Sequence, residues 1–384
     1  MKVLHLLKTS VGATWALRQI TELINIGVEV IVAFPDGPLV GKYRDAGAKI
    51  VLEQFDFVVK NPLLTWKRCK RLREIVDHHK PDIIQSHFVG TTLTMRLALR
   101  KYRHIPRIFM VPGPLHLEHF LFRRIELGFS QANDYWIASC EWTRECYIKN
   151  RVSPDKVGLS YYGGYPEEFS LQGNGVLYNE LGLDKSVKIV GMVAFMYAPK
   201  RYLFQKRGLK GHEDLMEAIA ICRQKNTSIH GVFVGGSWGN KAKWYEEQLK
   251  NYAKKICPEG IHLLGNRSDV PAIYPDFDVV VHPSHSENLG GSVESSLAKI
   301  PTIATNIGGF PDVIKHLNTG LLVEPESPEE LATQILYMLE HYEEAQVMVK
   351  NANELVIELC DVCNNAKTIA SYYNSIIDKG AIHV

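Results

Sequence analysis

Residues 279–299, VVVHPSHSENLGGSVESSLAK, place an apolar run, a glycine-rich turn and a helical stretch directly one after another. Val279–His282 is typical of a buried strand, and Ser292–Lys299 is typical of a helix that begins after Gly290 and Gly291. A strand followed by a helix is the repeating unit of a parallel α/β sheet. Glycines at such a turn let the backbone approach a ligand, and the free amides there can bind its phosphate.

The same alternation continues in both directions and breaks only once. Residues 163–175 are rich in turn residues and have no apolar period. The chain of 384 residues is also long enough for two cores. We therefore predict an α/β protein of two doubly wound domains, residues 1–165 and 166–362, with a C-terminal helix at about 363–384 that packs back on the first. Because ligands bind at the carboxyl ends of the strands in such sheets, we expect both domains to face a central cleft.

Composition excludes several classes of protein. No apolar run approaches the ~20 residues that cross a bilayer, and the apolar run in Met1–Lys8 is too short for a signal peptide. The odd count of seven cysteines indicates reduced thiols. We therefore expect a cytoplasmic protein. Neither a G-x-G-x-x-G fingerprint after the first strand nor a P-loop occurs, which disfavours nicotinamide and ATP enzymes.

Basic residues are concentrated in the first half, with clusters at residues 67–73 and 100–103. Such runs are solvated helix faces in many proteins. The alternative is attraction to an anionic membrane surface or to a lipid-diphosphate acceptor. We expect no nucleic-acid partner. Trp15, Trp66 and Trp142 occur at helical positions, which favours a place in the core over a role as ligand platforms.

Charged residues accompany the glycine turn. Glu287 and Glu294 flank it, and carboxylates beside a phosphate site are better suited to sugar and ribose hydroxyls than to phosphate itself. Lys210 opens a predicted helix where it can meet phosphate oxygens, and Arg207 can add a bidentate contact. The alternatives are that Glu294 caps its own helix and that both basic residues lie free in a surface loop.

A longer block, Glu294–Asp312 (ESSLAKIPTIATNIGGFPD), resembles the E-A-x-A-x-G-x-P-V-I-A-x-x-x-G-G-x-P-E block of retaining GT-B glycosyltransferases of glycosyltransferase family 4. Lys210-Gly211 and Pro283-Ser284 are similar to the K-G and P-S pairs of that family. Leu115-His116 resembles one of its histidine-bearing strand ends. The resemblance touches most of the chain and is strongest in the second domain.

The resemblance implies a GT-B fold of two Rossmann-like domains, an N-terminal one for the acceptor and a C-terminal one for the donor. It implies transfer of a hexose from a nucleotide-sugar, with UDP the commonest donor group, to a glycan or lipid-linked acceptor. Surface polysaccharide or glycolipid biosynthesis, at the inner face of the membrane, is the expected setting. The anomeric configuration would be retained, and neither a divalent metal nor another cofactor would be needed.

The resemblance also implies roles for individual residues. Glu294 would bind the ribose hydroxyls, Lys210 the phosphates, and His116 would lie beside the transferred sugar. The remaining donor contacts would come from the first strand's loop, from a nucleobase loop and from the glycine turn, that is, from Gly12, Asn266, Arg267, Asn288, Leu289, Gly290 and Gly291. We expect catalytic roles for His116, Glu287 and Lys210.

Two departures from the family leave alternatives open. Six residues separate Glu287 from Glu294 where the family has seven, so Ser286 occupies the first glutamate's place. The family's arginine after the first strand of the second domain is missing, and Arg201 or Arg207 would replace it. A nucleotide-sugar epimerase of the same fold and an inactive nucleotide-sugar-binding subunit are the alternative functions.

Overall fold

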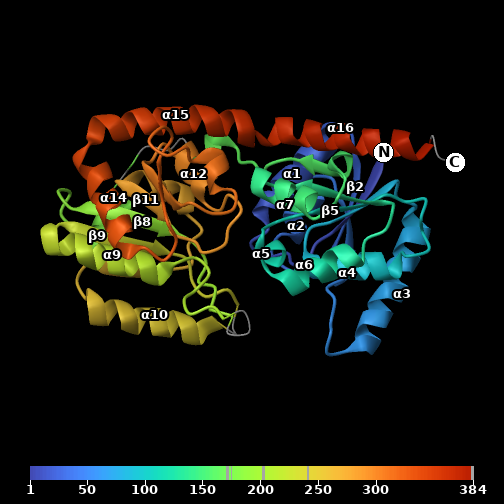
Figure 1. The fold of residues 1–384 in the computed structure, drawn as a ribbon, viewed down its shortest axis with the longest axis horizontal. Coiled ribbons are helices and arrows are strands. Elements are labelled where there is room, and N and C mark those ends of the chain that lie inside the picture. Colours follow the sequence, from blue (N-terminus) through green and yellow to red (C-terminus); the bar gives the residue numbers. More distant parts are fainter. Residues whose placement is uncertain (170–172, 174, 201–203, 240–241, 382–384) are drawn as a thin grey trace. The chain divides into compact units, whose positions relative to one another are not determined.

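The computed structural model describes residues 1–384 apart from 170–172, 174, 201–203, 240–241 and 382–384. The chain divides into two compact units, which Figure 1 shows in sequence colours. Unit 1 comprises Met1–Gly164 and Cys360–Val384, and unit 2 comprises Tyr165–Leu359. This division lies next to the predicted boundary after residue 165, and it assigns the last helix to the first unit.

Unit 1 is built on a seven-stranded parallel sheet in the order β3-β2-β1-β4-β5-β6-β7. Its strands are β1 (Lys2–Leu6), β2 (Glu29–Phe34), β3 (Lys49–Leu52), β4 (Ile83–Ser86), β5 (Arg107–Met110), β6 (Asp134–Ala138) and β7 (Val157–Leu159). With the helices between them, these strands form the strand–helix alternation that the sequence predicts. The strand order reverses between β1 and β4, where Val3 pairs with Ile83.

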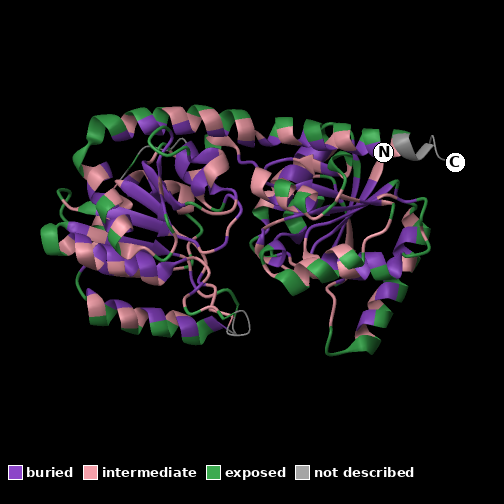
Figure 2. Cartoon of the chain, in the orientation of Figure 1, coloured by how far each residue is buried: buried purple, intermediate pink, exposed green. Residues whose placement is uncertain are grey.

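Helices cover both faces of this sheet. One face carries α1 (Thr14–Asn25), α2 (Val40–Asp45) and α16 (Val362–Ala381). The other carries α3 (Pro62–His79), α4 (Val89–Ala98), α6 (Phe120–Gly128) and α7 (Glu141–Lys149), with the short α5 (Leu115–Glu118) before α6. The strands are buried on both faces (Figure 2), which explains their unbroken apolar sequences.

The last helix, α16, completes the core of unit 1. Ile369 and Ile376 are buried among side chains of β1, β2 and α1. The Tyr373 hydroxyl donates a hydrogen bond of 2.5 Å to Oε1 of Gln85 on β4. The helix predicted at about 363–384 therefore packs on the core of unit 1.

Unit 2 has a six-stranded parallel sheet in the order β10-β9-β8-β11-β12-β13. Its strands are β8 (Lys188–Val193), β9 (Ile229–Val234), β10 (Ile261–Gly265), β11 (Val279–His282), β12 (Thr302–Thr305) and β13 (Leu321–Val323). The order reverses between β8 and β11, where Val190 pairs with Val279. The opening stretch of sequence thus supplies a central strand.

The helices of unit 2 are α8 (Val176–Leu181), α9 (His212–Lys225), α10 (Lys243–Ile256), α11 (Val270–Ile273), α12 (Ser292–Leu297), α13 (Phe310–Val313), α14 (Pro328–Glu340) and α15 (Tyr342–Cys360). Residues of β8, β9, β11, α9, α10 and α14 share one large apolar core. Within the described part of the chain, no helix is both long and apolar enough to cross a membrane.

One expectation about the aromatic residues is wrong. Trp15 packs 4.3 Å from the ring of Tyr162, and Trp142 packs against the core of unit 1. Trp66 instead leaves 60% of its surface exposed on α3. Helical spacing alone did not show which face of α3 is buried. Trp66 lies on the outer face of this helix, among basic residues.

Candidate functional site

Two charged side chains meet beyond the carboxyl ends of β8 and β11 in unit 2. Lys210 lies in the segment between β8 and α9, and Glu287 lies between β11 and α12. The two strands are neighbours at the reversal of strand order, so these segments leave the sheet side by side. Lys210 Nζ forms an ion pair with the Glu287 carboxylate, and the side chains are only 17% and 13% exposed. In open α/β sheets this is the place where ligands bind.

The backbone at Gly211 explains why the two segments touch. Gly211 has a φ of +68°, which disfavours any residue with a side chain. A Cβ atom there would also overlap the carbonyl oxygen of Pro283. Close by, the His285 amide donates to the carbonyl of Leu209 at 2.9 Å. The K-G and P-S pairs of the sequence therefore form one packed corner, which presents Lys210.

A second glycine pair supports the Glu287 segment from behind. Gly308 has a φ of +51°, and a Cβ atom there would overlap the Glu287 carbonyl oxygen. The amide of Gly309 donates to the carbonyl of Asn288 at 3.1 Å. The G-G pair at 308–309 thus fixes the backbone that carries Glu287 and Asn288.

The residues that follow Glu287 continue the same corner. Asn288 and Leu289 are buried, at 4% and 3% exposed. Oδ1 of Asn288 has no hydrogen-bond partner among the residues that the structure describes. A buried polar atom of this kind calls for a partner, which a ligand could supply. Gly290 and Gly291 then lead into α12.

Glu294 lies half-buried in the first turn of α12. Burial lowers the pKa of Lys210 to about 8, and the charge of Glu294 opposes that shift. Lys210 therefore lies within the electrostatic reach of both glutamates that the sequence singled out. The Lys210 ammonium also lies 5.7 Å from the ring centre of Tyr197, a contact that the sequence pattern did not indicate.

Arg207 is paired with carboxylates of α9. Its Nη1 atom pairs with Asp214 and, at 2.9 Å, with Glu217. Asp214 is 2% exposed and also accepts from His285 Nε2. Although burial alone would lower the pKa of His285, the hydrogen bond and charge of Asp214 raise it overall. Arg201, the alternative arginine, lies outside the described residues.

The predicted nucleobase loop is also tied down by its own contacts. Oδ1 of Asn266 accepts from the Gly236 amide at 2.7 Å. Arg267 donates from Nη2 to Asp269 at 2.7 Å and from Nη1 to Glu180 at 2.6 Å. Asn266 therefore joins the segments after β9 and β10, and Arg267 holds its own turn.

An aromatic group lies on the segments after β8 and β9. The ring of Trp238 stacks on Tyr197 at 5.3 Å between centres, and it meets the edge of Phe195 at 4.9 Å. Trp238 is 37% exposed. Sequence reasoning missed this group because its members come from two strands.

The two first-domain candidates lie in unit 1. Gly12 has a φ of +67° in the exposed segment after β1. His116 lies on α5, after β5, and is 7% exposed. Its Nε2 atom is 3.2 Å from the hydroxyl of Tyr147, which is completely buried. Burial lowers the pKa of His116 to about 4, so the imidazole is neutral at pH 7.

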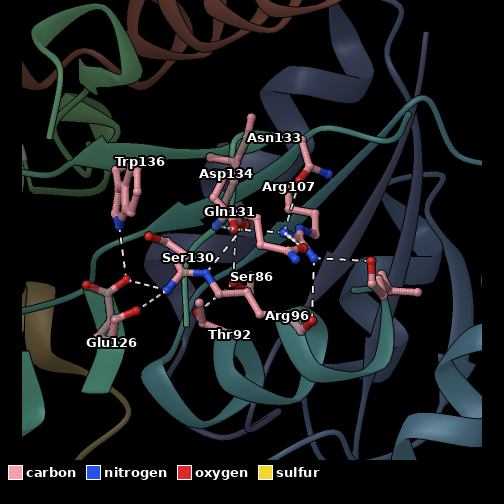
Figure 3. Close-up of polar contacts among 12 residues, drawn as sticks. Ser86, Thr92, Arg96, Arg107, Glu126, Ser130, Gln131, Asn133, Asp134 and Trp136 are labelled. Atoms are coloured by element: carbon pink, nitrogen blue, oxygen red, sulfur yellow. Dashed lines mark hydrogen bonds and ion pairs between the residues drawn. The ribbon is translucent and has the colours of Figure 1, made fainter. Parts of the chain in front are cut away.

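A buried ionic cluster lies behind Tyr147, and Figure 3 shows its geometry. Arg96 Nη1 pairs with Glu126 at 2.7 Å, and Arg107 Nη2 pairs with Asp134 at 2.8 Å. All four side chains are at most 1% exposed. Burial raises the pKa of Tyr147 well above its usual value, and a hydrogen bond to Glu126 contributes. The cluster thus reaches His116 through Tyr147, and no sequence pattern pointed to it.

The D-x-D triplet at 276–278 serves the backbone. Asp276 accepts from the amide of Leu177 at 2.8 Å, and Asp278 accepts from the amide of Ile189 at 2.8 Å. These contacts agree with a structural role for both carboxylates. In the described ranges, no three His, Cys, Asp or Glu side chains form a group able to hold a metal ion.

The architecture identifies the class of protein. The chain has the GT-B fold, since it aligns over 98% of its length, and all of the other chain, with the Anabaena Alr3699/HepE structure solved with UDP and glucose (TM-score 0.82, 20% identity). A structure described as a putative UDP-N-acetylglucosamine 2-epimerase from Listeria monocytogenes also matches, at a TM-score of 0.67 and 15% identity over 98% of this chain and 97% of that one.

Within that class, residues in both halves of the chain match glycosyltransferase family models. Residues 12–163 match Glycosyltransferase Family 4, and residues 201–355 match Glycosyl transferases group 1. The chain is 24% identical to a Campylobacter jejuni N,N'-diacetylbacillosaminyl-diphospho-undecaprenol alpha-1,3-N-acetylgalactosaminyltransferase, over 91% of each chain. It is 22% identical to the Staphylococcus aureus capsular polysaccharide biosynthesis glycosyltransferase CapM, over 87% of this chain and 86% of the other.

Proposed function

We propose that the protein is a retaining, metal-independent hexosyltransferase that uses a nucleotide-sugar, with UDP as the favoured donor group. The acceptor is a glycan or a lipid-linked saccharide of surface polysaccharide or glycolipid biosynthesis, and the reaction takes place at the cytoplasmic face of an anionic membrane. The observation that carries this proposal is the Lys210–Glu287 pair, which is largely shielded from solvent, at the switch point of unit 2. A ligand with phosphates and hydroxyls satisfies both of these groups.

In this proposal the donor diphosphate takes the place of the Glu287 carboxylate on Lys210. Lys210 then stabilises the negative charge that develops on the leaving diphosphate, an effect worth about 3–4 kcal/mol for one well-placed donor. Glu287 becomes free to accept a sugar hydroxyl, and Glu294 accepts the ribose hydroxyls. His116 acts on the transferred sugar. Its neutral imidazole can donate or accept a hydrogen bond without adding charge.

The relatives support the choice of donor and acceptor. The Anabaena structure contains UDP and glucose, and the Campylobacter jejuni relative is named for transfer to a diphospho-undecaprenol. The Staphylococcus aureus relative is named for capsular polysaccharide biosynthesis.

The test is turnover of nucleotide-sugars by the purified protein in excess EDTA. We expect release of the nucleoside diphosphate and a product that keeps the donor's anomeric configuration by NMR. Lys210→Ala and Glu294→Ala should each lower kcat/KM about 100-fold. Lys254→Ala, at an exposed position on α10, is the matched control. Activity that disappears in EDTA and returns with Mg²⁺ contradicts metal independence.

Two other outcomes favour the alternatives. A free epimerised sugar formed without an acceptor would favour the epimerase, to which the Listeria monocytogenes match points. Nucleotide binding without turnover on any donor and acceptor would favour an inactive subunit, to which the shortened spacing of Glu287 and Glu294 points.

A further inference from the structure

Residues 59–70, which we call the α3 tip, form an apolar and basic projection from unit 1. They comprise the first turns of α3 and the segment that leads into it, drawn in blue at the lower right of Figure 1 and largely exposed in Figure 2. Val59, Leu63 and Trp66 are 79%, 75% and 60% exposed. Three large apolar side chains this exposed in one short segment indicate an interaction surface.

The charge of the tip has a single sign. No acidic residue occurs between residues 59 and 73. Lys60, Lys67 and Lys70 are exposed, and none of them forms an ion pair within the described part of the chain. Arg71, which faces the body of the unit, is instead bonded to Glu53 at 2.8 Å. Positive charge without a carboxylate partner therefore lies on the outer face.

Helical spacing puts the apolar and basic groups on that same outer face. Thr65, Cys69 and Leu72 are buried along one side of α3. The opposite side carries Leu63, Trp66, Lys67 and Lys70, which follow the i, i+3, i+4, i+7 pattern of a single face. A lysine can bury its methylene chain beside an apolar neighbour and keep its ammonium in a polar layer.

The tip is held in place by local hydrogen bonds. Oδ1 of Asn61 caps the helix by accepting from the Leu64 amide at 3.0 Å, and Pro62 occupies the first turn. The Thr65 hydroxyl accepts from the Val58 amide and donates to the Val58 carbonyl, each at 3.1 Å. The outward apolar side chains therefore belong to a helix start that is fixed by hydrogen bonds.

The tip begins at the carboxyl edge of the sheet, the edge that carries Gly12 and His116. Asp56, just before the tip, pairs at 3.3 Å with Lys8, which follows β1. Other exposed apolar residues occur on segments that leave this edge: Val11 after β1, at 51%, and Phe120 and Leu121 at the start of α6, at 59% and 53%.

We propose that the α3 tip docks unit 1 onto an anionic lipid bilayer. Leu63 and Trp66 enter the interfacial layer, where tryptophan is favoured, and Lys60, Lys67 and Lys70 bind the anionic headgroups. Charge complementarity and the apolar anchor act together, since one signal alone gives only marginal binding. This inference deepens the proposed function and rests on it only for the acceptor: the carboxyl edge of unit 1 would face a lipid-linked saccharide in the membrane.

The test is flotation of the full chain with vesicles of phosphatidylcholine, with or without phosphatidylglycerol. We expect binding to the anionic vesicles alone, reduced by salt. Lys67→Gln with Lys70→Gln should lower the partition coefficient roughly 30-fold, because each lysine near such a surface contributes about fivefold. Leu63→Ser with Trp66→Ser should lower the partition coefficient more than added salt lowers that of the wild type.

The matched control lies on α10 of unit 2, where Trp244 is 49% exposed and Lys254 and Lys255 are exposed. Trp244→Ser with Lys254→Gln and Lys255→Gln should leave vesicle binding unchanged. Equal effects of the tip and control variants, or no binding by the wild type, overturn the proposal. So does a wild-type dimer that dissociates in the tip variants while vesicles are ignored.

Vesicle binding and sugar transfer are measured separately, so each can fail without the other. Protein that binds anionic vesicles through the tip yet turns over no nucleotide-sugar retains the membrane surface and contradicts the transferase. Protein that transfers sugar to a water-soluble acceptor yet ignores vesicles contradicts the membrane surface alone. Circular dichroism of each variant shows whether it is folded.

Discussion

At the scale of single residues, paired charges with little exposure to solvent occur at both candidate positions. In unit 2 the ammonium of Lys210 is held against Glu287, and in unit 1 Glu126 is completely buried beside Arg96. A buried charge that loses its partner is strongly destabilising. These groups are therefore fixed in direction, which is the property that a site needs in order to receive a charged ligand.

The contact of Tyr147 with His116 leads to a prediction about orientation. Tyr147→Phe removes a hydroxyl 3.2 Å from the imidazole, so His116 loses its fixed direction. We expect kcat to fall about tenfold, the value of one such hydrogen bond, with little change in the KM of the donor. The measurement is steady-state kinetics across pH, in which the limb that reports His116 should also shift.

Tyr43→Phe is the control for this prediction. Tyr43 is also completely buried, and its hydroxyl has no partner within the described residues. Its removal should leave kcat unchanged. If the two variants lose the same activity, the effect is one of stability, and Tyr147 does not position His116.

The residue types of the candidate site could be read from the sequence, but their partners could not. Lys210, Glu287 and Glu294 stand in a recognisable order along the chain. The engagement of Arg207 by Asp214 and Glu217 could not be foreseen, because it depends on which face of α9 turns inward. Tyr147 and Glu126 were missed for the same reason, since tertiary contacts alone bring them to His116.

At the scale of elements, the residues of the candidate site in unit 2 lie mainly on loops. The segments after β8 and β11 meet because Gly211 fits against Pro283 and because Gly308 fits against Glu287. The strands themselves were predictable, since β-branched runs buried on both faces have few alternatives. The way the loops pack was not, because it depends on single backbone positions.

A glycine substitution tests this packing. Gly308→Ala should push the Glu287 segment outward, since the new Cβ would overlap the Glu287 carbonyl oxygen. We expect donor affinity to fall at least tenfold, and stability to fall by about 1–3 kcal/mol from the strained backbone. Calorimetric titration and thermal unfolding measure the two effects.

Gly182→Ala separates strain from overlap. Gly182 has a φ of +63°, similar to that of Gly308, but no atom lies within 4 Å of the position that a Cβ atom would take there. It should lose stability without losing donor affinity. Equal losses of affinity in both variants would contradict the packing of the Glu287 segment on Gly308.

At the scale of the whole molecule, two units share one chain that crosses between them twice. The first crossing is marked by the turn-rich residues 163–175, and it was predictable from the loss of apolar period. The second falls between Leu359 and Cys360, inside an otherwise helical stretch. The prediction that the C-terminal helix at about 363–384 packs back on the first domain agrees with this division. The exposed face of α3 was not predictable, because its basic residues fit a solvated helix equally well.

The central claim is that Lys210 binds a diphosphate without a metal. Calorimetric titration with UDP in EDTA, repeated from pH 7 to pH 9, tests it most directly. The pKa of Lys210 is lowered to about 8, so its charge is present below pH 8 and is lost as the pH rises through that value. The diphosphate stays ionised over this range, because its terminal phosphate has a pKa of about 6.

We expect one UDP per chain, with a Kd that is constant at low pH and rises about tenfold per pH unit above pH 8. Lys210→Ala should bind about 100-fold more weakly, with no such pH dependence. Lys254→Ala should behave as the wild type. Binding by Lys210→Ala that equals the wild type, or wild-type binding that appears only with a divalent cation, would contradict metal-independent diphosphate binding by Lys210.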